Sequence, residues 1–364
     1  MAAVSATQLS PCQPQLQTAD VEPEPYSTAT TNQPQDEIPN ADDDSSGSIA
    51  STTTTDQSHS SNLLVPPRFP PSHYASVTNL ILICCHAIYL PCPSSPTFPL
   101  SNPHNESNWH LAPFQRSNPA TYKPGEHEIF LQHLSTGLST LTTGAWAGTS
   151  LLVLSGGATQ RRTTATSEAR SYWHAALAQE LVSGERRARH AFTRGLLLLE
   201  EHATDSFQNL LFGVLAFRRA TGRYPAQVRI VTYAFKARRF LELHAAALRW
   251  PGSRIRVVGL DPVMSVDERR ETEEAEERHG FLPWERDRFG MGEVLRGKRM
   301  KRGWDERVLE ELEEGLEGSV RALLEWDGGD EGGGRWEREV GKLPWEETDE
   351  MILREKGQDE GAGK

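Results

Sequence analysis

Cysteine is scarce in this sequence and poorly placed for disulfides or for zinc. The 364 residues include four cysteines, Cys12, Cys84, Cys85 and Cys92, without a Cys-x-x-Cys pair or paired histidine ligands downstream. Cys84 and Cys85 are neighbours in a predicted strand and should point to opposite faces. We therefore expect reduced thiols in a cytoplasmic protein and no zinc site.

Long apolar runs and a targeting signal are also missing. The longest apolar stretch, residues 80–90, contains His86 and is well short of the roughly 20 apolar residues that span a bilayer. The N-terminus lacks the basic segment followed by an apolar one that marks a signal peptide. The sequence thus predicts no membrane segment.

Basic residues are outnumbered by acidic ones. The 38 Lys and Arg against 50 Asp and Glu give a formal net charge of -12 at pH 7. Polyanions repel such a chain on average, which argues against nonspecific binding to nucleic acid or to anionic membranes. Hydrophobic residues make up only 37% and the mean hydropathy is -0.55, so we expect long tails beside one folded domain.

Composition divides the chain into three parts. Residues 1–75 are rich in Ser, Thr, Pro, Gln and Asp, and we expect them to be disordered because they contain too little apolar area to offset ordering entropy. Residues 76–325 are expected to fold, with a flexible Pro/Ser-rich insertion at 91–107. Charged helices form the C-terminal extension of this domain, and residues 326–364 form an acidic Gly/Glu-rich tail.

Short apolar segments alternate with helical patterns along the predicted domain. Strands are predicted at residues 79–85, 151–154, 196–199, 228–232 and 255–259, and helices at 125–142, 167–181, 206–221 and 237–248. This alternation predicts an α/β fold with a mostly parallel sheet of about five strands and helices on both faces. Right-handed crossovers place the carboxyl ends of the strands along one edge, where such sheets bind ligands.

The most informative stretch is residues 196–209. Four leucines predict a strand buried on both faces, and Glu200-Glu201-His202 follow directly. Asp205 with Gln208 three residues later predicts a helix start with a capping box. A polar cluster at such a strand-to-helix switch indicates a binding site as well as a turn.

The predicted strand ends bring side chains of both charges to one edge. The catalytic candidates are His86, Glu201 and Asp205, and the ligand-binding candidates are Ser155, Gly156, Gly157, Glu168, Glu201, Asp205, Asn209, Lys236, Arg238 and Asp261. Carboxylates at helix starts would repel a simple phosphate, whereas they would accept hydrogen bonds from ribose hydroxyls or an amino group. The basic residues would meet the acidic end of the ligand. This pattern favours a small nucleotide-like or zwitterionic metabolite.

Other interpretations fit the same residues. Asp205 could serve only as a helix cap, worth about 1 kcal/mol, the two glycines could simply turn the chain, and His86 could be structural. A hydrolase assisted by Mg²⁺ or Mn²⁺ is an alternative in which Glu168, Glu201, Asp205 and Asp261 supply oxygen ligands, although no spaced metal motif assigns a ligand. The acidic tails indicate a third alternative, a non-catalytic interaction scaffold whose protein partners the sequence leaves unknown.

Four blocks of the sequence resemble the YdcF-like family, also called domain of unknown function 218. The blocks are Leu-Ser-Gly-Gly at 154–157, Ser-Glu-Ala at 167–169 followed by Tyr172, Glu-Glu-His-Ala-Thr-Asp-Ser-Phe-Gln-Asn at 200–209, and Val-Thr at 231–232 followed by Phe-Lys-Ala-Arg-Arg-Phe at 235–240. Their order and spacing agree with the family over residues 78–300. Further segments at 85–89, 222–225 and 259–262, with Trp109 and Trp250, are similar to its fungal cytosolic branch.

The resemblance implies a Rossmann-like domain with a polar crevice and no settled activity. The ligand expected from the charge pattern, a nucleotide-like or S-adenosyl-type metabolite, would bind in that crevice. This chain departs from the pattern at Lys236, where bacterial members tend to have a histidine before the arginine. A mechanism that needs an imidazole at that point therefore does not carry over.

Overall fold

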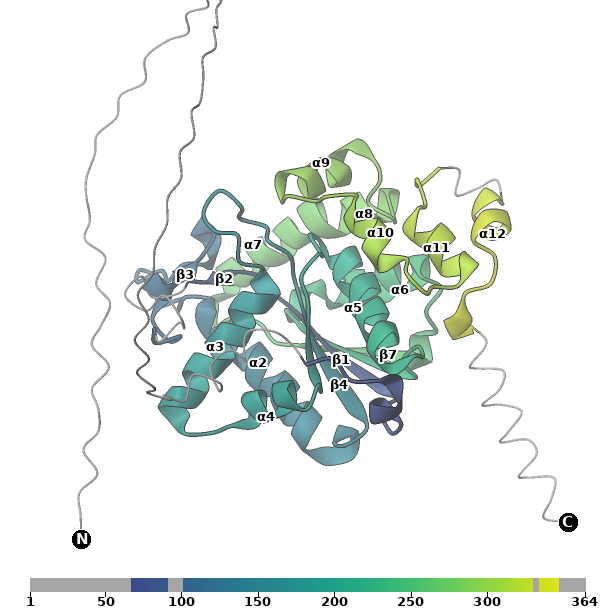
Figure 1. Ribbon diagram of the computed structural model, residues 1–364. Coiled ribbons are helices and arrows are strands. Elements are labelled where there is room, and N and C mark those ends of the chain that lie inside the picture. The colour runs from purple at the N-terminus through teal and green to yellow at the C-terminus, as the bar shows by residue number, and fades with distance from the viewer. Residues whose placement is uncertain (1–66, 91–100, 330–333, 347–364) are drawn as a thin grey trace, which may run out of the picture.

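A parallel sheet of five strands forms the centre of the protein (Figure 1). The computed structural model describes residues 67–90, 101–329 and 334–346; the predicted disordered tail before residue 67 and residues 91–100 of the insertion lie outside them. The strands are β1 (Asn79–Cys84), β4 (Ser150–Ser155), β5 (Leu197–Glu200), β6 (Gln227–Thr232) and β7 (Ile255–Gly259). The expected α/β fold is confirmed.

The strand order is β5-β4-β1-β6-β7. The chain starts in the centre, moves outward through β4 and β5, and returns to the other side of β1 for β6 and β7. Asn79 of β1 is paired with Ser150 on one side and with Gln227 on the other. This is the order of Rossmann-like sheets, and it places a topological switch point between β1 and β6, where ligands of such folds bind.

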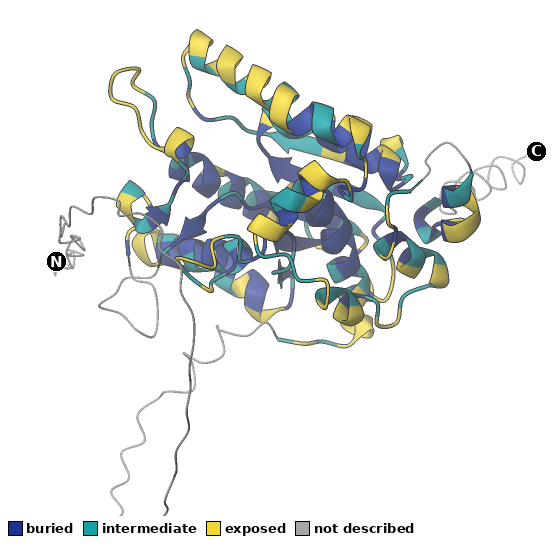
Figure 2. Cartoon of the chain, turned by 90° about the horizontal axis from the view of Figure 1, so that it is seen from above, coloured by how far each residue is buried: buried dark blue, intermediate teal, exposed yellow. Residues whose placement is uncertain are grey.

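Helices cover both faces of the sheet. One face carries α2 (His127–Thr142), α3 (Glu168–Ser183) and α4 (Arg187–Thr193), and the other carries α5 (Ser206–Thr221), the π-helical turn η6 (Arg239–His244) and α6 (Ala245–Ala247). Strand β1 alternates between them, with Leu82 and Cys84 in one apolar cluster and Ile83 and Cys85 in the other. Both cysteines are buried, and they lie on opposite faces as expected. Figure 2 shows this buried centre in dark blue.

Strand β5 differs in one respect from its prediction. Leu198 and Leu199 are only half-buried, whereas the run of leucines predicts burial on both faces. The reason is position, because β5 lies at the edge of the described sheet and has a neighbouring strand on one side only.

Beyond β7 the chain is helical. The segments are α7 (Val266–Glu276), the π-helical η8 (Glu277–Phe281), α8 (Leu282–Arg286), α9 (Glu293–Lys301), α10 (Val308–Leu312), α11 (Gly318–Leu324) and α12 (Arg335–Val340). Two short strands, β2 (Ile88–Tyr89) and β3 (Trp109–His110), pair antiparallel beside the main sheet. Within the three described ranges, no helix is long and apolar enough to cross a membrane.

The last described helices pack onto the core. Trp326, Trp336 and Trp345 are buried in the same apolar cluster as α5 and β6. The boundary predicted at residue 325 falls inside this packing. At the other end, Tyr74 of the 3-10 turn η1 (Pro71–Tyr74) is buried just before the boundary predicted at 76. The packed unit therefore includes described residues on both sides of the predicted limits.

Candidate functional site

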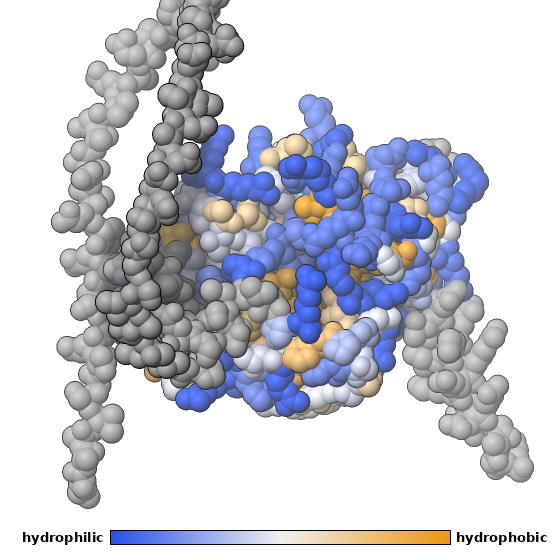
Figure 3. Space-filling model, in the orientation of Figure 1, coloured by the Kyte–Doolittle hydropathy of each residue, from blue (hydrophilic) through white to orange (hydrophobic). Residues whose placement is uncertain are grey.

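A crevice opens at the carboxyl edge of the sheet, at the switch point between β1 and β6. Its volume is about 840 Å³, within the usual range for small-molecule sites. Its walls come from the ends of β1 and β6, the starts of α3 and α5, the extension helices α7 and α9, and residues 110–126. Figure 3 shows a mainly hydrophilic surface over the extension, with scattered apolar residues.

The structure brings some predicted site residues together in the crevice and leaves others outside its lining. Those that line it are His86, Glu168, Asp205, Asn209 and Lys236. Those that do not are Ser155, Gly156, Gly157, Glu201, Arg238 and Asp261.

Ser155 belongs to a buried network beside the crevice. Its hydroxyl lies 2.5 Å from Glu200 Oε2 and 2.9 Å from Asn209 Oδ1. A hydroxyl has one proton for these two acceptors, so either Glu200 is protonated or the Asn209 amide is turned to donate. Burial raises the pKa of Glu200 to about 7, which favours the protonated carboxyl below neutral pH.

Gly156 and Gly157 lie in the turn between β4 and α3, and this turn contacts the start of α3 and the turn between β5 and α5. A Cβ on Gly156 would lie 2.9 Å from Glu168 Oε2, and one on Gly157 would lie 2.9 Å from the Ala203 carbonyl oxygen. The Gly157 N–H donates to that carbonyl at 2.7 Å. The absence of a side chain therefore lets the β4–α3 turn approach the β5–α5 turn, which is a packing role.

Glu201 is held by α3. Its carboxylate lies 2.6 Å from Arg170 Nη2 and accepts a hydrogen bond of 2.6 Å from the Ser167 hydroxyl. Ser167 is also the N-cap of α3 and accepts from the Arg170 N–H at 3.0 Å. Glu201 thus fixes the start of α3 against the end of β5.

Arg238 and Asp261 also have protein partners outside the crevice lining. Arg238 is exposed and pairs with Glu242 and Glu277, each at 3.0 Å. Asp261 Oδ1 accepts from the backbone N–H of Ala234 at 2.7 Å. The first is a surface ion pair and the second stabilises the turn after β6.

Asp205 caps α5, and its charge is balanced. Its Oδ1 accepts from the Gln208 N–H at 2.9 Å, and its Oδ2 lies 2.5 Å from Nε of the buried Arg299. A capping box would have the Gln208 side chain accept from the N–H of Asp205. It accepts instead from the N–H of the preceding residue, Thr204, at 2.8 Å. The compensated Asp205 repels an anion much less than the sequence argument assumed.

His86 lies on the floor of the crevice beneath Lys236. Its Nε2 is 3.0 Å from Thr232 Oγ1, and Lys236 Nζ is 3.5 Å from its Nδ1. Burial, reinforced by the charge of Lys236, holds the pKa of His86 well below its ordinary value, so the ring is neutral. Because lysine donates to Nδ1, the ring proton is on Nε2 and donates to Thr232. His86 therefore has no free lone pair with which to act as a base.

Four further lysine and arginine side chains line the crevice: Lys123, Arg239, Lys298 and Arg302. Sequence reasoning did not include Lys123, Lys298 and Arg302 among the residues at the predicted edge. Arg239 pairs with Glu276 at 3.3 Å, and Arg302 donates to the Thr204 carbonyl at 2.8 Å. Burial lowers the pKa of Lys298 and the nearby arginines lower it further. Lys298 and Arg302 belong to a short basic run in an otherwise acidic extension, which was the available sequence signal.

Glu168 faces the crevice from the first turn of α3. The Thr159 hydroxyl donates to its Oε1 at 2.5 Å. Burial raises the pKa of Glu168 to about 7, although that hydrogen bond opposes the shift. Glu168 can therefore gain or lose a proton near neutral pH.

The carboxylates of the metal-assisted alternative do not form a ligand set. Within the described ranges, no three His, Cys, Asp or Glu side chains are arranged so that they could hold a metal ion. Glu168 accepts a hydrogen bond from the Thr159 hydroxyl, and Glu201 and Asp205 form ion pairs with Arg170 and Arg299. The geometry gives the hydrolase alternative no support.

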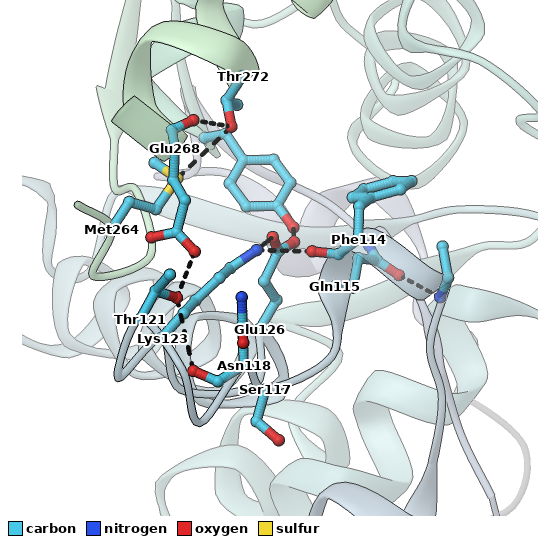
Figure 4. Close-up of polar contacts among 12 residues, drawn as sticks. Phe114, Gln115, Ser117, Asn118, Thr121, Lys123, Glu126, Met264, Glu268 and Thr272 are labelled. Carbon is cyan, nitrogen blue, oxygen red and sulfur yellow. Dashed lines mark hydrogen bonds and ion pairs between the residues drawn. The ribbon is translucent and has the colours of Figure 1, made fainter. Parts of the chain in front are cut away.

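Residues 111–126 link the extension to the sheet at the mouth of the crevice. The Thr121 hydroxyl donates to Glu268 Oε1 of α7 at 2.6 Å, and Lys123 pairs with Glu126 at 3.0 Å (Figure 4). The Tyr233 hydroxyl, just after β6, donates to Glu126 Oε2 at 2.5 Å. This loop therefore joins α7 to the crevice floor.

A yeast protein is similar to this chain. The chain is 28% identical over 218 residues to "Uncharacterized protein YOR238W" of Saccharomyces cerevisiae, and the match covers 50% of this chain and 67% of that protein. No protein-family model matches the sequence, and no solved structure matches it.

Proposed function

We propose that the protein binds a small anionic metabolite, of the nucleotide-like or S-adenosyl type, in the crevice. The observation that carries the proposal is the convergence of Lys236, Arg239, Lys298 and Arg302 on this one space. A fifth cation of the lining, Lys123, is paired with Glu126. Arginine and lysine in a partly desolvated site are the usual ligands of phosphate and carboxylate groups.

Six carboxylates also line the crevice, namely those of Glu126, Glu168, Asp205, Glu268, Glu271 and Glu276. Glu126 is paired with Lys123 at 3.0 Å. Asp205 is neutralised by Arg299, and burial raises the pKa of Glu168 to about 7. Arg239 has its own partner in Glu276. Among the described residues, Lys236, Lys298 and Arg302 have no carboxylate partner. An anion that enters the crevice would stabilise these charges, so the ligand would bind through its acidic group.

Aromatic rings provide a second type of contact. Tyr233 is buried between the rings of His86 and Phe235, with centroids 4.4 and 4.7 Å away, so the rings available to a ligand are those of Phe235 and of Phe114, which is 71% exposed. Such rings suit the flat base of a nucleotide. Glu168 and Asn209 line the crevice where they can meet hydroxyl or amino groups, a role that the sequence assigned to Glu168, Glu201 and Asp205.

Membership of the YdcF-like family is part of this proposal. It is supported by the strand order and by a polar crevice at the strand ends, both of which the resemblance implies. A cytoplasmic location belongs to the same proposal.

Replacing Arg302 by alanine is expected to weaken binding of the anionic ligand about 10- to 100-fold, because a hydrogen bond to a charged group contributes about 1.5–3 kcal/mol. Isothermal titration calorimetry with AMP, ADP, S-adenosylmethionine and inorganic phosphate measures this. Arg302 is exposed, so the variant should fold. Arg238→Ala is the matched control, because it removes a neighbouring exposed arginine that does not line the crevice.

Equal losses in Arg302→Ala and Arg238→Ala would contradict a specific site. If no ligand of the panel binds and removal of the tails alone abolishes association with protein partners, the scaffold alternative gains. If Mn²⁺ raises the melting temperature and Glu168→Gln abolishes the shift, the metal-assisted alternative gains instead.

A further inference from the structure

Lys236 is set apart from the other cations of the crevice by its partners. Among the described residues Lys236, like Lys298 and Arg302, forms no ion pair with a carboxylate. Lys298 and Arg302 donate instead to the backbone carbonyls of His279 and Thr204. The one hydrogen bond of Lys236 is to Nδ1 of the neutral His86 at 3.5 Å, and its Nζ lies 4.7 Å from the centre of the Tyr233 ring. A lysine held in this way has no paired carboxylate, and its partial burial removes part of the water that stabilises an ordinary ammonium.

The surroundings of Lys236 favour the neutral amine. Burial lowers its pKa to about 8, and the guanidinium of Arg239 contributes in the same direction. The ring of Tyr233 favours the ammonium form, but this contact is weaker than desolvation together with a nearby like charge. Relative to an unperturbed lysine, a pKa of about 8 gives an about 300-fold larger fraction of neutral amine at pH 7.

We infer that Lys236 is a covalent catalytic residue, whose amine forms an imine with an aldehyde or ketone that carries an acidic group. Half-buried lysines next to another cation are the type that forms such Schiff bases. The acidic group would lie against Arg239 and Arg302, which places the carbonyl carbon near Nζ. The inference rests on the proposed function for this orientation and goes beyond it in assigning a reaction.

The step balances without a further reactant. The nitrogen lone pair of Lys236 attacks the carbonyl carbon and forms the C–N bond, while the carbonyl oxygen takes up a proton. The C–O bond then breaks, and the oxygen leaves as water with the two protons that the amine nitrogen gives up. Glu168, which lines the same crevice and titrates near neutral pH, is placed to carry protons between nitrogen and oxygen.

Reductive trapping tests this assignment on the full-length protein. Pyridoxal 5′-phosphate is the phosphate-bearing aldehyde probe, pyridoxal is its counterpart without phosphate, and cyanoborohydride reduces any imine to a stable amine. Peptide mass spectrometry should find about one adduct per chain, on Lys236. Its rate of formation should rise with pH with a midpoint near 8.

Lys236→Arg keeps the positive charge but cannot form an imine, and it should lower incorporation at least 10-fold. Lys123→Arg is the matched control, since Lys123 also lines the crevice but is paired with Glu126, and its replacement should leave incorporation unchanged. Adducts spread over many lysines, or full incorporation in Lys236→Arg, would overturn the inference.

The two proposals fail in different ways. If nucleotides bind the wild type and Lys236→Arg equally well but the wild type forms no adduct, anion binding stands and the imine is excluded. If pyridoxal labels Lys236 as fast as its phosphate does, the imine stands and the anionic site is contradicted.

Discussion

Replacing Trp345 by alanine is expected to lower the free energy of unfolding by about 3–5 kcal/mol. The side chain is 1% exposed and packs against Trp250 and Tyr224, with ring centroids 5.3 and 5.1 Å away. Its Nε1 donates to the Leu248 carbonyl at 2.7 Å. The substitution removes the ring, leaves a cavity and deprives a buried carbonyl of its partner.

Urea denaturation followed by circular dichroism measures this loss. Tyr122→Ala is the matched control, because it removes another large aromatic that is 90% exposed and should change stability by no more than about 0.5 kcal/mol. Equal effects of the two substitutions would show that residues 334–346 do not belong to the cooperative core.

Glu200→Gln is expected to change the pH dependence of stability by about 3 kcal/mol between acidic and mildly alkaline pH. Glu200 is 4% exposed, and burial raises its pKa from 4.5 to about 7. Because the folded pKa exceeds the unfolded one, the stability contributed by the neutral carboxyl is complete below pH 4.5. It is lost as the pH rises through 7. Glutamine cannot ionise and does not undergo this loss.

The measurement is the free energy of unfolding of both proteins at pH 5 and pH 8. Buried histidines such as His86 and His244 have lowered pKa values, so keeping them neutral costs the folded protein stability as the pH falls. This contribution is the same in both proteins and cancels in the difference between their free energies of unfolding. Glu314→Gln, at an exposed position, should give a curve parallel to that of the wild type. A parallel curve for Glu200→Gln would show that Glu200 is ionised and that the Asn209 amide donates to Ser155.

The fold could be predicted because its signals are local. Each strand of the sheet is a short apolar run, and the caps of α3 and α5 lie within three residues of the groups that they satisfy. The crevice location followed from the same pattern, because parallel strands end at one edge. His86, Asn209 and Lys236 line the crevice at that edge for this reason.

The choice between adjacent residues could not be made from sequence. Glu200 and Glu201 are neighbours at the end of β5, yet one joins the buried Ser155 network and the other an ion pair with α3. Arg238 and Arg239 are neighbours after β6, yet one is exposed and the other buried in the crevice lining. The sequence pattern did not show which member of each pair faces inward, because that depends on packing with distant segments.

The distant partners themselves give no local signal. Arg299 balances Asp205 across 94 residues of sequence, and Arg302 reaches the Thr204 carbonyl across 98. These contacts determine which charges of the site are compensated, because Arg299 neutralises Asp205 and Arg302 adds a cation to the crevice lining.

The ion pair between Asp205 and Arg299 also bears on how the chain folds during its synthesis. Helix α5 and its cap leave the ribosome long before α9, so Asp205 emerges without its cation. The buried Arg254 gains one of its partners later still, because it donates to the carbonyl of Trp345 at 2.7 Å. The sheet can therefore assemble early, whereas the binding crevice acquires its charges only when the last helices have been translated.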